Sequence, residues 1–304
     1  MWYYALAHRP SKVREVMNLL IAYSLIQSTA FPPAADLDDY LHRLLTDRKN
    51  TLELCAAQDM EAAELLGKML SGYASLRQFY DIRDNEQTLL PHATPRARRQ
   101  QAATALISVV ASADDNIRGG LFDRTRDGIV SEDFLLALLG EVLVFVSDPD
   151  STSVHDHGRQ QQQQGPPVIS LEQIDVILKA VEDLQAVGSR VYTSCDEFLQ
   201  LVLASAPGGL KGSTPADLLK KSAAAAAGQG GNLVLAGSSL VASQLQRSLG
   251  GTGALGKVAV KRGWDWRGEV AAKTKGEDVL RRLRLGVARD LAGLWLAEAD
   301  EMVW

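Results

Sequence analysis

The chain has 304 residues and a formal charge of −5 at pH 7, with two cysteines and an aromatic share of only 6%. Its net acidity argues against a duplex-DNA binder, because phosphate contacts require clustered Lys and Arg. Two lone cysteines provide neither a disulfide framework nor a metal-ligand spacing. The most apolar run, 134–146, is too short to cross a bilayer, so we expect no transmembrane segment.

The first part of the chain, residues 1–146, is predicted to be a stack of helices. Residues 2–6 are helix-like, and Pro10 is expected to end that turn before Ser11 caps a second helix. Because the chain opens inside a helix, we expect it to be a fragment of a longer protein. Apolar residues three and four positions apart predict further helices at 36–45, 52–70, 73–83, 96–113 and 133–146.

Two of these helices have distinctive compositions. Ser71-Gly72 is predicted to separate the helices at 52–70 and 73–83, because glycine is unfavourable inside a helix. The segment 133–146 is apolar nearly all round, which is typical of a helix that is buried on most sides.

Residues 147–167 are predicted to be a low-complexity linker, since their Gln, Pro and Gly composition cannot bury a core. The second part of the stack is 168–304, and it includes a Gly/Ser/Ala-rich insertion at about 205–262. Ser170 and Gln173 form a predicted capping box. The helix that this box opens is expected to continue through 174–184, and further helices are expected at 195–204, 216–227 and, at the end of the chain, about 277–301.

The terminal helix carries one regular apolar face. Its large apolar residues recur at spacings of 3, 4, 4 and 3, and they are Leu280, Leu283, Val287, Leu291 and Leu294. The arginines beside them are most simply interpreted as a solvated face.

The pattern as a whole predicts an all-α protein of about ten helices. Strand alternation is nearly absent, and 257–261 is the only short candidate. Consecutive helices joined by short loops stack as antiparallel neighbours, so the predicted architecture is an irregular α-solenoid. No motif recurs at a fixed period, which argues against a regular repeat array.

Three short motifs resemble ligand sites, but each lacks a required part. Gly251–Lys257 has phosphate-loop spacing, yet Val258 stands where a hydroxyl would bind magnesium. Asp123–Gly128 copies the first half of an EF-hand loop, but the twelfth position is Phe134. His155-Asp156-His157 has no further Cys or His cluster that would complete a zinc site. We therefore expect no cofactor, no metal and no enzyme activity.

Two tryptophans two positions apart, Trp264 and Trp266, precede the terminal helix among cationic residues. One interpretation is that their rings pin the loop onto the helical core, because tryptophan is highly buried on average. The other is that they anchor a partner, since Trp and Arg dominate interface hot spots.

The end of the chain resembles a known family. Glu277–Ala292 reads as a leucine, an Arg-Leu pair and an Ala-Arg-x-Leu-Ala ending, which is similar to the C-terminal helix of one group of scaffold nucleoporins. This group forms the short arm of the Y-shaped outer-ring complex and pairs with the Seh-type β-propeller. Ile129–Phe134 and Ile169–Ile174 resemble the paired helices that precede that terminal helix. The resemblance covers roughly residues 65–300, with insertions at 147–167 and 205–262.

The resemblance implies a fold related to coat-protein cage elements, an elongated helical stack that doubles back and ends in a tail module. It implies a non-enzymatic scaffold at the nuclear pore that supports mRNA and protein transport within a hetero-oligomer. The expected partners are other Y-complex nucleoporins at the hub where the arms meet the stalk, with no direct contact to nucleic acid. The residues expected to bind partners are Trp264, Trp266, Arg289 and Trp295.

Two other functions are compatible with the residues. A helical adaptor of the vesicle-coat or proteasome-lid type would share the same helical pattern. A nucleotide-binding protein would use Gly251–Lys257.

Overall fold

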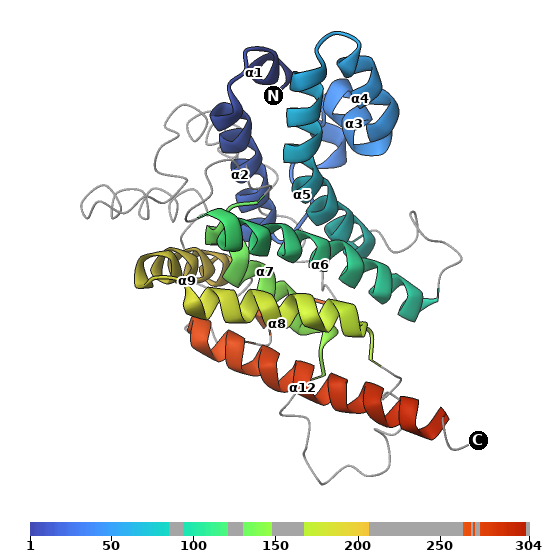
Figure 1. The fold of residues 1–304 in the computed structure, drawn as a ribbon, viewed down its shortest axis with the longest axis vertical. Coiled ribbons are helices and arrows are strands. Elements are labelled where there is room, and N and C mark those ends of the chain that lie inside the picture. Colours follow the sequence, from blue (N-terminus) through green and yellow to red (C-terminus); the bar gives the residue numbers. More distant parts are fainter. Residues whose placement is uncertain are drawn as a thin grey trace.

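The computed structural model describes residues 1–84, 94–120, 130–147, 167–206, 264–268, 270 and 274–301. Within these ranges every regular element is a helix, which confirms the predicted all-α class (Figure 1). None of the described helices combines the length and hydropathy needed to span a bilayer.

Several predictions from the sequence lie outside the described residues. They are the helix at 216–227, the strand candidate at 257–261, and the motifs Asp123–Gly128, His155–His157 and Gly251–Lys257. Most of the linker and of the 205–262 insertion also lies outside, so the division into two helical parts stays a prediction.

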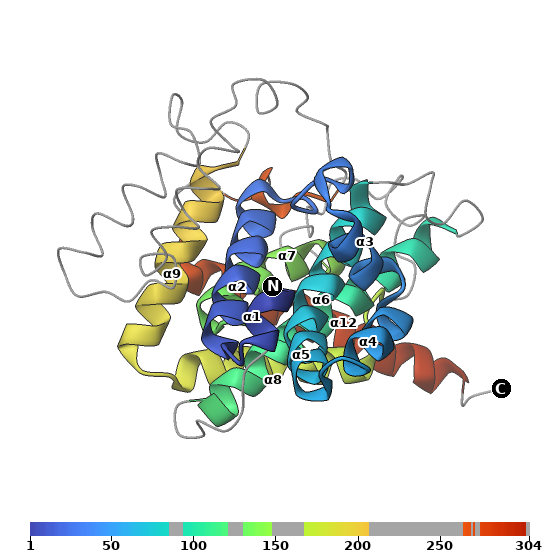
Figure 2. The ribbon, with the colours of Figure 1, turned by 90° about the horizontal axis from the view of Figure 1, so that it is seen from above.

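The N-terminal part is built around two long helices that lie side by side. The shorter elements pack beside them, with α4 against the second long helix and α3 against α4 (Figures 1 and 2). The elements in order are α1 (Trp2–Leu6), α2 (Pro10–Gln27), a 3-10 turn (Ala34–Asp36), α3 (Asp39–Thr46), α4 (Arg48–Ala56) and α5 (Met60–Asp84).

The remaining helices form successive layers below α5. Helix α6 (Pro95–Gly120) contacts α5, α8 (Leu171–Ala186) contacts α6, and α12 (Gly276–Glu301) contacts α8 in turn. Figure 1 shows α6, α8 and α12 one beneath another. Helix α9 (Ser189–Ala204) packs against α2 and against α7 (Leu135–Val142).

Helix α7 lies at the centre of this arrangement. It contacts α6, α8, α9 and α12, and all eight of its residues are buried. Short 3-10 turns, Glu132–Phe134 and Leu143–Phe145, extend it at both ends. The prediction that the apolar segment 133–146 is enclosed on most sides is therefore confirmed.

The predicted break at Ser71-Gly72 is wrong. Helix α5 runs without interruption for 25 residues, and Gly72 is buried within it. The break falls instead between α4 and α5, where the Asp59 carboxylate accepts a hydrogen bond from the Ala62 backbone N–H at 2.9 Å. One glycine inside a helix costs about 1 kcal/mol relative to alanine. The cap at Asp59 and the burial of Gly72 against its neighbours together outweigh this cost.

The predicted start of the second helix is also wrong. Helix α2 begins at Pro10, with Arg9 as its N-cap and no side-chain cap bond, so Ser11 is inside the helix. Proline suits the first helical position because a backbone N–H at that position would have no intrahelical partner. Proline, which has no N–H, therefore loses no hydrogen bond there.

Other boundaries agree with the sequence or extend beyond it. The capping box is confirmed: the Gln173 N–H donates to Ser170 Oγ at 3.3 Å, and the Ser170 N–H donates to Gln173 Oε1 at 3.0 Å. Helix α9 starts at Ser189, six positions before the predicted start, and α6 continues to Gly120.

Candidate partner-binding surface

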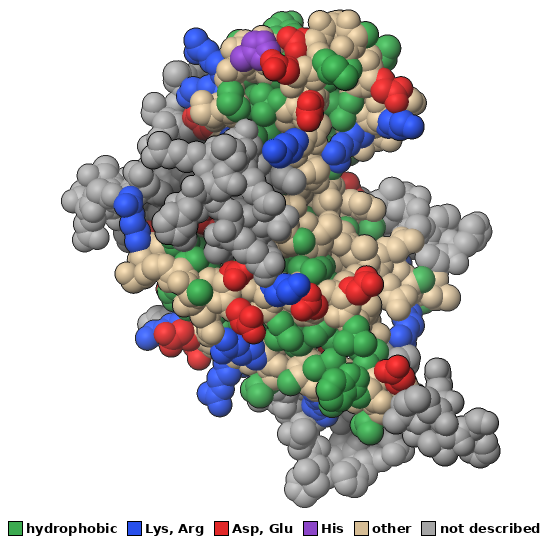
Figure 3. Space-filling model, in the orientation of Figure 1, with side chains coloured by type: hydrophobic (Ala, Val, Ile, Leu, Met, Phe, Trp, Pro, Cys, Tyr) green, Lys and Arg blue, Asp and Glu red, His purple; other side chains and the backbone are tan. Residues whose placement is uncertain are grey.

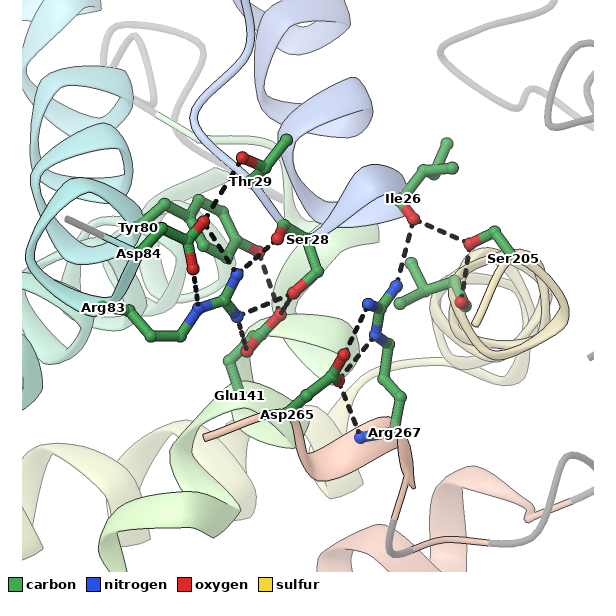
Figure 4. Close-up of polar contacts among 11 residues, drawn as sticks. Ile26, Ser28, Thr29, Tyr80, Arg83, Asp84, Glu141, Ser205, Asp265 and Arg267 are labelled. Carbon is green, nitrogen blue, oxygen red and sulfur yellow. Dashed lines mark hydrogen bonds and ion pairs between the residues drawn. The ribbon is translucent and has the colours of Figure 1, made fainter. Parts of the chain in front are cut away.

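The structure has a buried polar cluster at its centre and, at its edge, a helix with one exposed face, α12. The central cluster surrounds Glu141, a fully buried carboxylate on α7 (Figure 4). Tyr80 Oη donates to Glu141 Oε1 at 2.9 Å, and Ser28 Oγ donates to the same oxygen at 3.4 Å. Arg83 Nη1 lies 3.9 Å from Glu141 Oε2. Burial raises the pKa of Glu141, although the Arg83 and Arg267 cations oppose that shift.

Arg83, on α5, forms hydrogen bonds to the C-terminal end of α2. Its Nη1 donates to Ser28 Oγ at 2.8 Å, its Nη2 donates to the Ser28 carbonyl, and its Nε donates to Asp84 Oδ1 at 2.8 Å. Ser28 is the C-cap of α2 and has the left-handed backbone. The carbonyl at this helix end thus receives a charged donor, which is a strong class of hydrogen bond.

A second buried cation, Arg267, attaches the short segment Trp264–Gly268 to the same helix end. Its Nε and Nη2 donate to the two carboxylate oxygens of Asp265, each at 2.8 Å, and its Nη1 donates to the Ile26 carbonyl at 3.2 Å. Ser205 Oγ donates to that carbonyl at 2.7 Å (Figure 4). The end of α2 therefore joins α5, α9 and the segment before α12.

Both tryptophans of this segment pack against the core of the chain. Trp266 is 1% exposed, and a Cβ added at Gly140 would lie 2.5 Å from its ring, so α7 requires glycine at that position. The half-buried Trp264 ring lies 6.1 Å from the Phe145 ring, and the Arg99 guanidinium lies 5.8 Å from it. This packing favours the interpretation in which the rings pin the loop, and it leaves Trp266 no exposed surface for a partner.

The inner face of α12 is held by packing and by polar contacts at two points. Leu280, Leu283 and Val287 are buried, and Leu291 and Leu294 pack partly buried against the core. The Gly276 N–H donates to Asp196 Oδ1 at 2.9 Å. Farther along, Asp290 accepts from the Ser147 N–H at 3.2 Å and from Ser147 Oγ at 2.5 Å. The predicted apolar stripe is thus largely covered within the chain.

The outer face of α12 carries a second apolar stripe, which was not predicted from the sequence. Leu285 is 49% exposed, Trp295 is 63% exposed and Leu296 is 68% exposed. Ala288 and Ala292, which lie between them in the sequence, are exposed as well. Figure 3 shows hydrophobic side chains gathered over this helix. We call this set the outer stripe: Leu285, Ala288, Ala292, Trp295 and Leu296.

A groove adjoins the N-terminal end of this stripe, where the α8–α9 turn meets the first turns of α12. Its volume is about 790 Å³. The lining combines apolar side chains with two arginines of α12, and it consists of Leu184, Gln185, Val187, Ser189, Tyr192, Thr193, Glu277, Leu280, Arg281, Arg284 and Leu285.

The four residues predicted to bind partners do not form one site. Trp264 and Trp266 lie in the core segment, whereas Arg289 and Trp295 lie on α12. Arg289 is half-buried and Trp295 is exposed. The outer stripe could have been found from the sequence, because its members recur three and four positions apart. No group of His, Cys, Asp and Glu suited to a metal ion occurs in the described part of the chain.

Comparisons with known proteins give one informative match. The chain is 75% identical, over 308 aligned positions, to the nucleoporin NUP85 of Chaetomium thermophilum. The alignment includes all of this chain but only 25% of the relative, so the chain spans about a quarter of the relative's length. No protein-family model and no solved structure matches.

Proposed function

We propose that this chain is a helical module of a scaffold nucleoporin in the outer ring of the nuclear pore complex. The observation that carries the proposal is the 75% identity, through the whole chain, to a nucleoporin. The module acts by helix-to-helix contact and supports nucleocytoplasmic transport of mRNA and protein. Its place is the nuclear pore complex at the nuclear envelope.

The finer assignment is to the short arm of the Y-shaped complex, in the member that pairs with the Seh-type propeller. Its support is the resemblance of Glu277–Ala292 to the terminal helix of that group. In this assignment the chain belongs to a hetero-oligomer and contacts other outer-ring nucleoporins at the hub. The exposed position of Trp295 agrees with the expectation that this residue binds a partner.

A localisation and purification experiment tests both levels of the proposal. We expect the tagged chain, expressed in cells of its source, to accumulate at the nuclear rim and to co-purify with outer-ring nucleoporins. A tagged Leu283→Asp variant is the matched control, because a charge placed in the core should unfold the tail and abolish recovery.

The composition of the recovered complex decides between the alternatives. Recovery of outer-ring nucleoporins without a Seh-type propeller would leave the coarse assignment in place and contradict the propeller pairing for this part of the protein. Recovery of vesicle-coat or proteasome-lid subunits in place of nucleoporins would contradict the proposal itself.

A further inference from the structure

We propose that the outer stripe and the adjoining groove receive one amphipathic helix from another scaffold chain, and that carboxylates of that helix face Arg281 and Arg284. This inference rests on the proposed scaffold function, and it adds the kind of element that binds and the chemistry that recognises it. Three observations carry it: the spacing of the stripe, the shape of the groove and the charge beside it.

The stripe has the geometry of a helix-binding face. Its members lie at relative positions 0, 3, 7, 10 and 11, and this spacing places them along one side of an α-helix. Small residues, Ala288 and Ala292, lie between Leu285 and the pair Trp295-Leu296. Small side chains allow another helix to approach closely, while the large ones at either end pack around it. Such a face is costly to leave in water along three turns.

The groove extends this face at its N-terminal end. Leu285 belongs to both the stripe and the groove, and Leu184 and Val187 bring apolar surface from the α8–α9 turn. A helix lying along the stripe therefore has a recess of about 790 Å³ at one end, which is large enough for apolar side chains. Helices that dock in grooves in this way use anchor side chains three, four and seven positions apart.

The charge beside the groove indicates which helix fits. Arg281 and Arg284 are exposed and lie one turn apart on α12. Arg281 makes no ion pair with any described residue, and the described contact of Arg284 is with the neutral amide of Gln185. Glu277 is the only carboxylate among the lining residues. Two exposed cations three positions apart repel each other, and carboxylates on a bound helix would relieve that repulsion.

Site-specific cross-linking identifies the occupant. We would incorporate the photoreactive amino acid p-benzoylphenylalanine at Ala288 and assemble the chain with purified outer-ring nucleoporins. We expect cross-links to a single segment of another nucleoporin that has an apolar stripe of helical spacing and Asp or Glu beside it. Glu61, an exposed residue in the first turn of α5, is the control position and should not give that product. It lies 3.5 Å from His8, which follows α1, and α1 and α12 are at opposite ends of the molecule in Figure 1.

Other cross-linked products would overturn the inference. A product that joins two copies of this chain would assign the face to self-association. A product within one chain would show that its own segments cover the stripe. Formation of the complex without any product from Ala288 would show that the face is unused.

Affinity measurements separate this inference from the proposed function. We expect Ala288→Arg to weaken binding to the purified outer-ring nucleoporins by at least about tenfold, because it places bulk and charge in the middle of the contact. Arg281→Glu with Arg284→Glu should weaken binding about tenfold and reduce its salt dependence, whereas the double lysine variant should retain most of the affinity. Unchanged melting temperatures would exclude unfolding as the cause.

Failure of the proposed function and failure of this inference give different binding results. If the unaltered chain does not bind the outer-ring nucleoporins, the proposed function is wrong. If it binds and Ala288→Arg binds equally well, only the inference about this face is wrong.

Discussion

The centre of the molecule and its terminal helix use the same residue types for opposite purposes. Around α7, charged residues and a tryptophan are enclosed, and each cation there has oxygen partners from two or more segments. On the outer side of α12, arginines and a tryptophan face solvent. Composition therefore did not distinguish the two regions. The number of neighbouring helices did, because α7 is surrounded by four helices whereas α12 lies in the last layer (Figure 1).

The largest expected effect is on the inner face of α12. Leu283→Asp should lower the free energy of unfolding by about 4–5 kcal/mol, because it buries a charge that has no partner. Chemical denaturation followed by circular dichroism measures this change. A loss below about 1 kcal/mol would show that the inner face is not part of the core.

Glu141→Ala tests the polar centre directly. It should cost about 3–5 kcal/mol, because the Tyr80 hydroxyl would lose its buried acceptor and the Arg83 cation would lose the carboxylate 3.9 Å away. Glu141→Gln keeps an acceptor oxygen and should cost clearly less, as judged by denaturant midpoints. Equal losses in the two variants would mean that packing around residue 141 matters more than its hydrogen bonds.

Trp266→Ala should destabilise the chain by about 3 kcal/mol, because the cavity it leaves against Gly140 cannot close fully. Gly140→Leu, which blocks the same contact from the other side, should give a loss of similar size. The double variant should lose little more than either single one, and a double-mutant cycle from thermal melts checks this. Fully additive losses would contradict the contact between the two residues.

The smallest effect on stability is expected on the outer side of α12. Trp295→Ala combined with Arg289→Glu should change the free energy of unfolding by less than about 1 kcal/mol, because Trp295 is exposed. The same variant should weaken assembly with outer-ring nucleoporins, as measured by co-purification. If it melts like Leu283→Asp, this flank belongs to the core and the comparison between the two faces fails.

Local patterns of sequence predicted the elements better than the contacts between them. The capping box at Ser170 and the burial of α7 follow from spacing and composition within a few turns, and both were predicted. The continuity of α5 through Gly72 depends on neighbours distant in the sequence, and the local pattern predicted the wrong boundary.

The candidate surface was only partly predictable for the same reason. Arg289 and Trp295 were identified as partner-facing, but the groove combines residues of α8, α9 and α12, and no spacing rule brings those together. The outer stripe was present in the sequence, but beside a stronger inner stripe its alanines look like ordinary helix formers. The pairing of Glu141 with Tyr80 joins residues 61 positions apart, and local sequence carries no sign of it.

The contact of Arg267 with the Ile26 carbonyl has a consequence for how the chain folds during synthesis. These two residues are 241 positions apart, so this bond at the end of α2 cannot form before residue 267 has been synthesised. Contacts of such long range carry a high loop-closure entropy and form slowly. We therefore expect nascent chains that stop before residue 264 to have faster amide hydrogen exchange at the end of α2 than chains that include residues 264–268. The conformation of an early helix end would then depend on a segment that is synthesised more than 230 residues later.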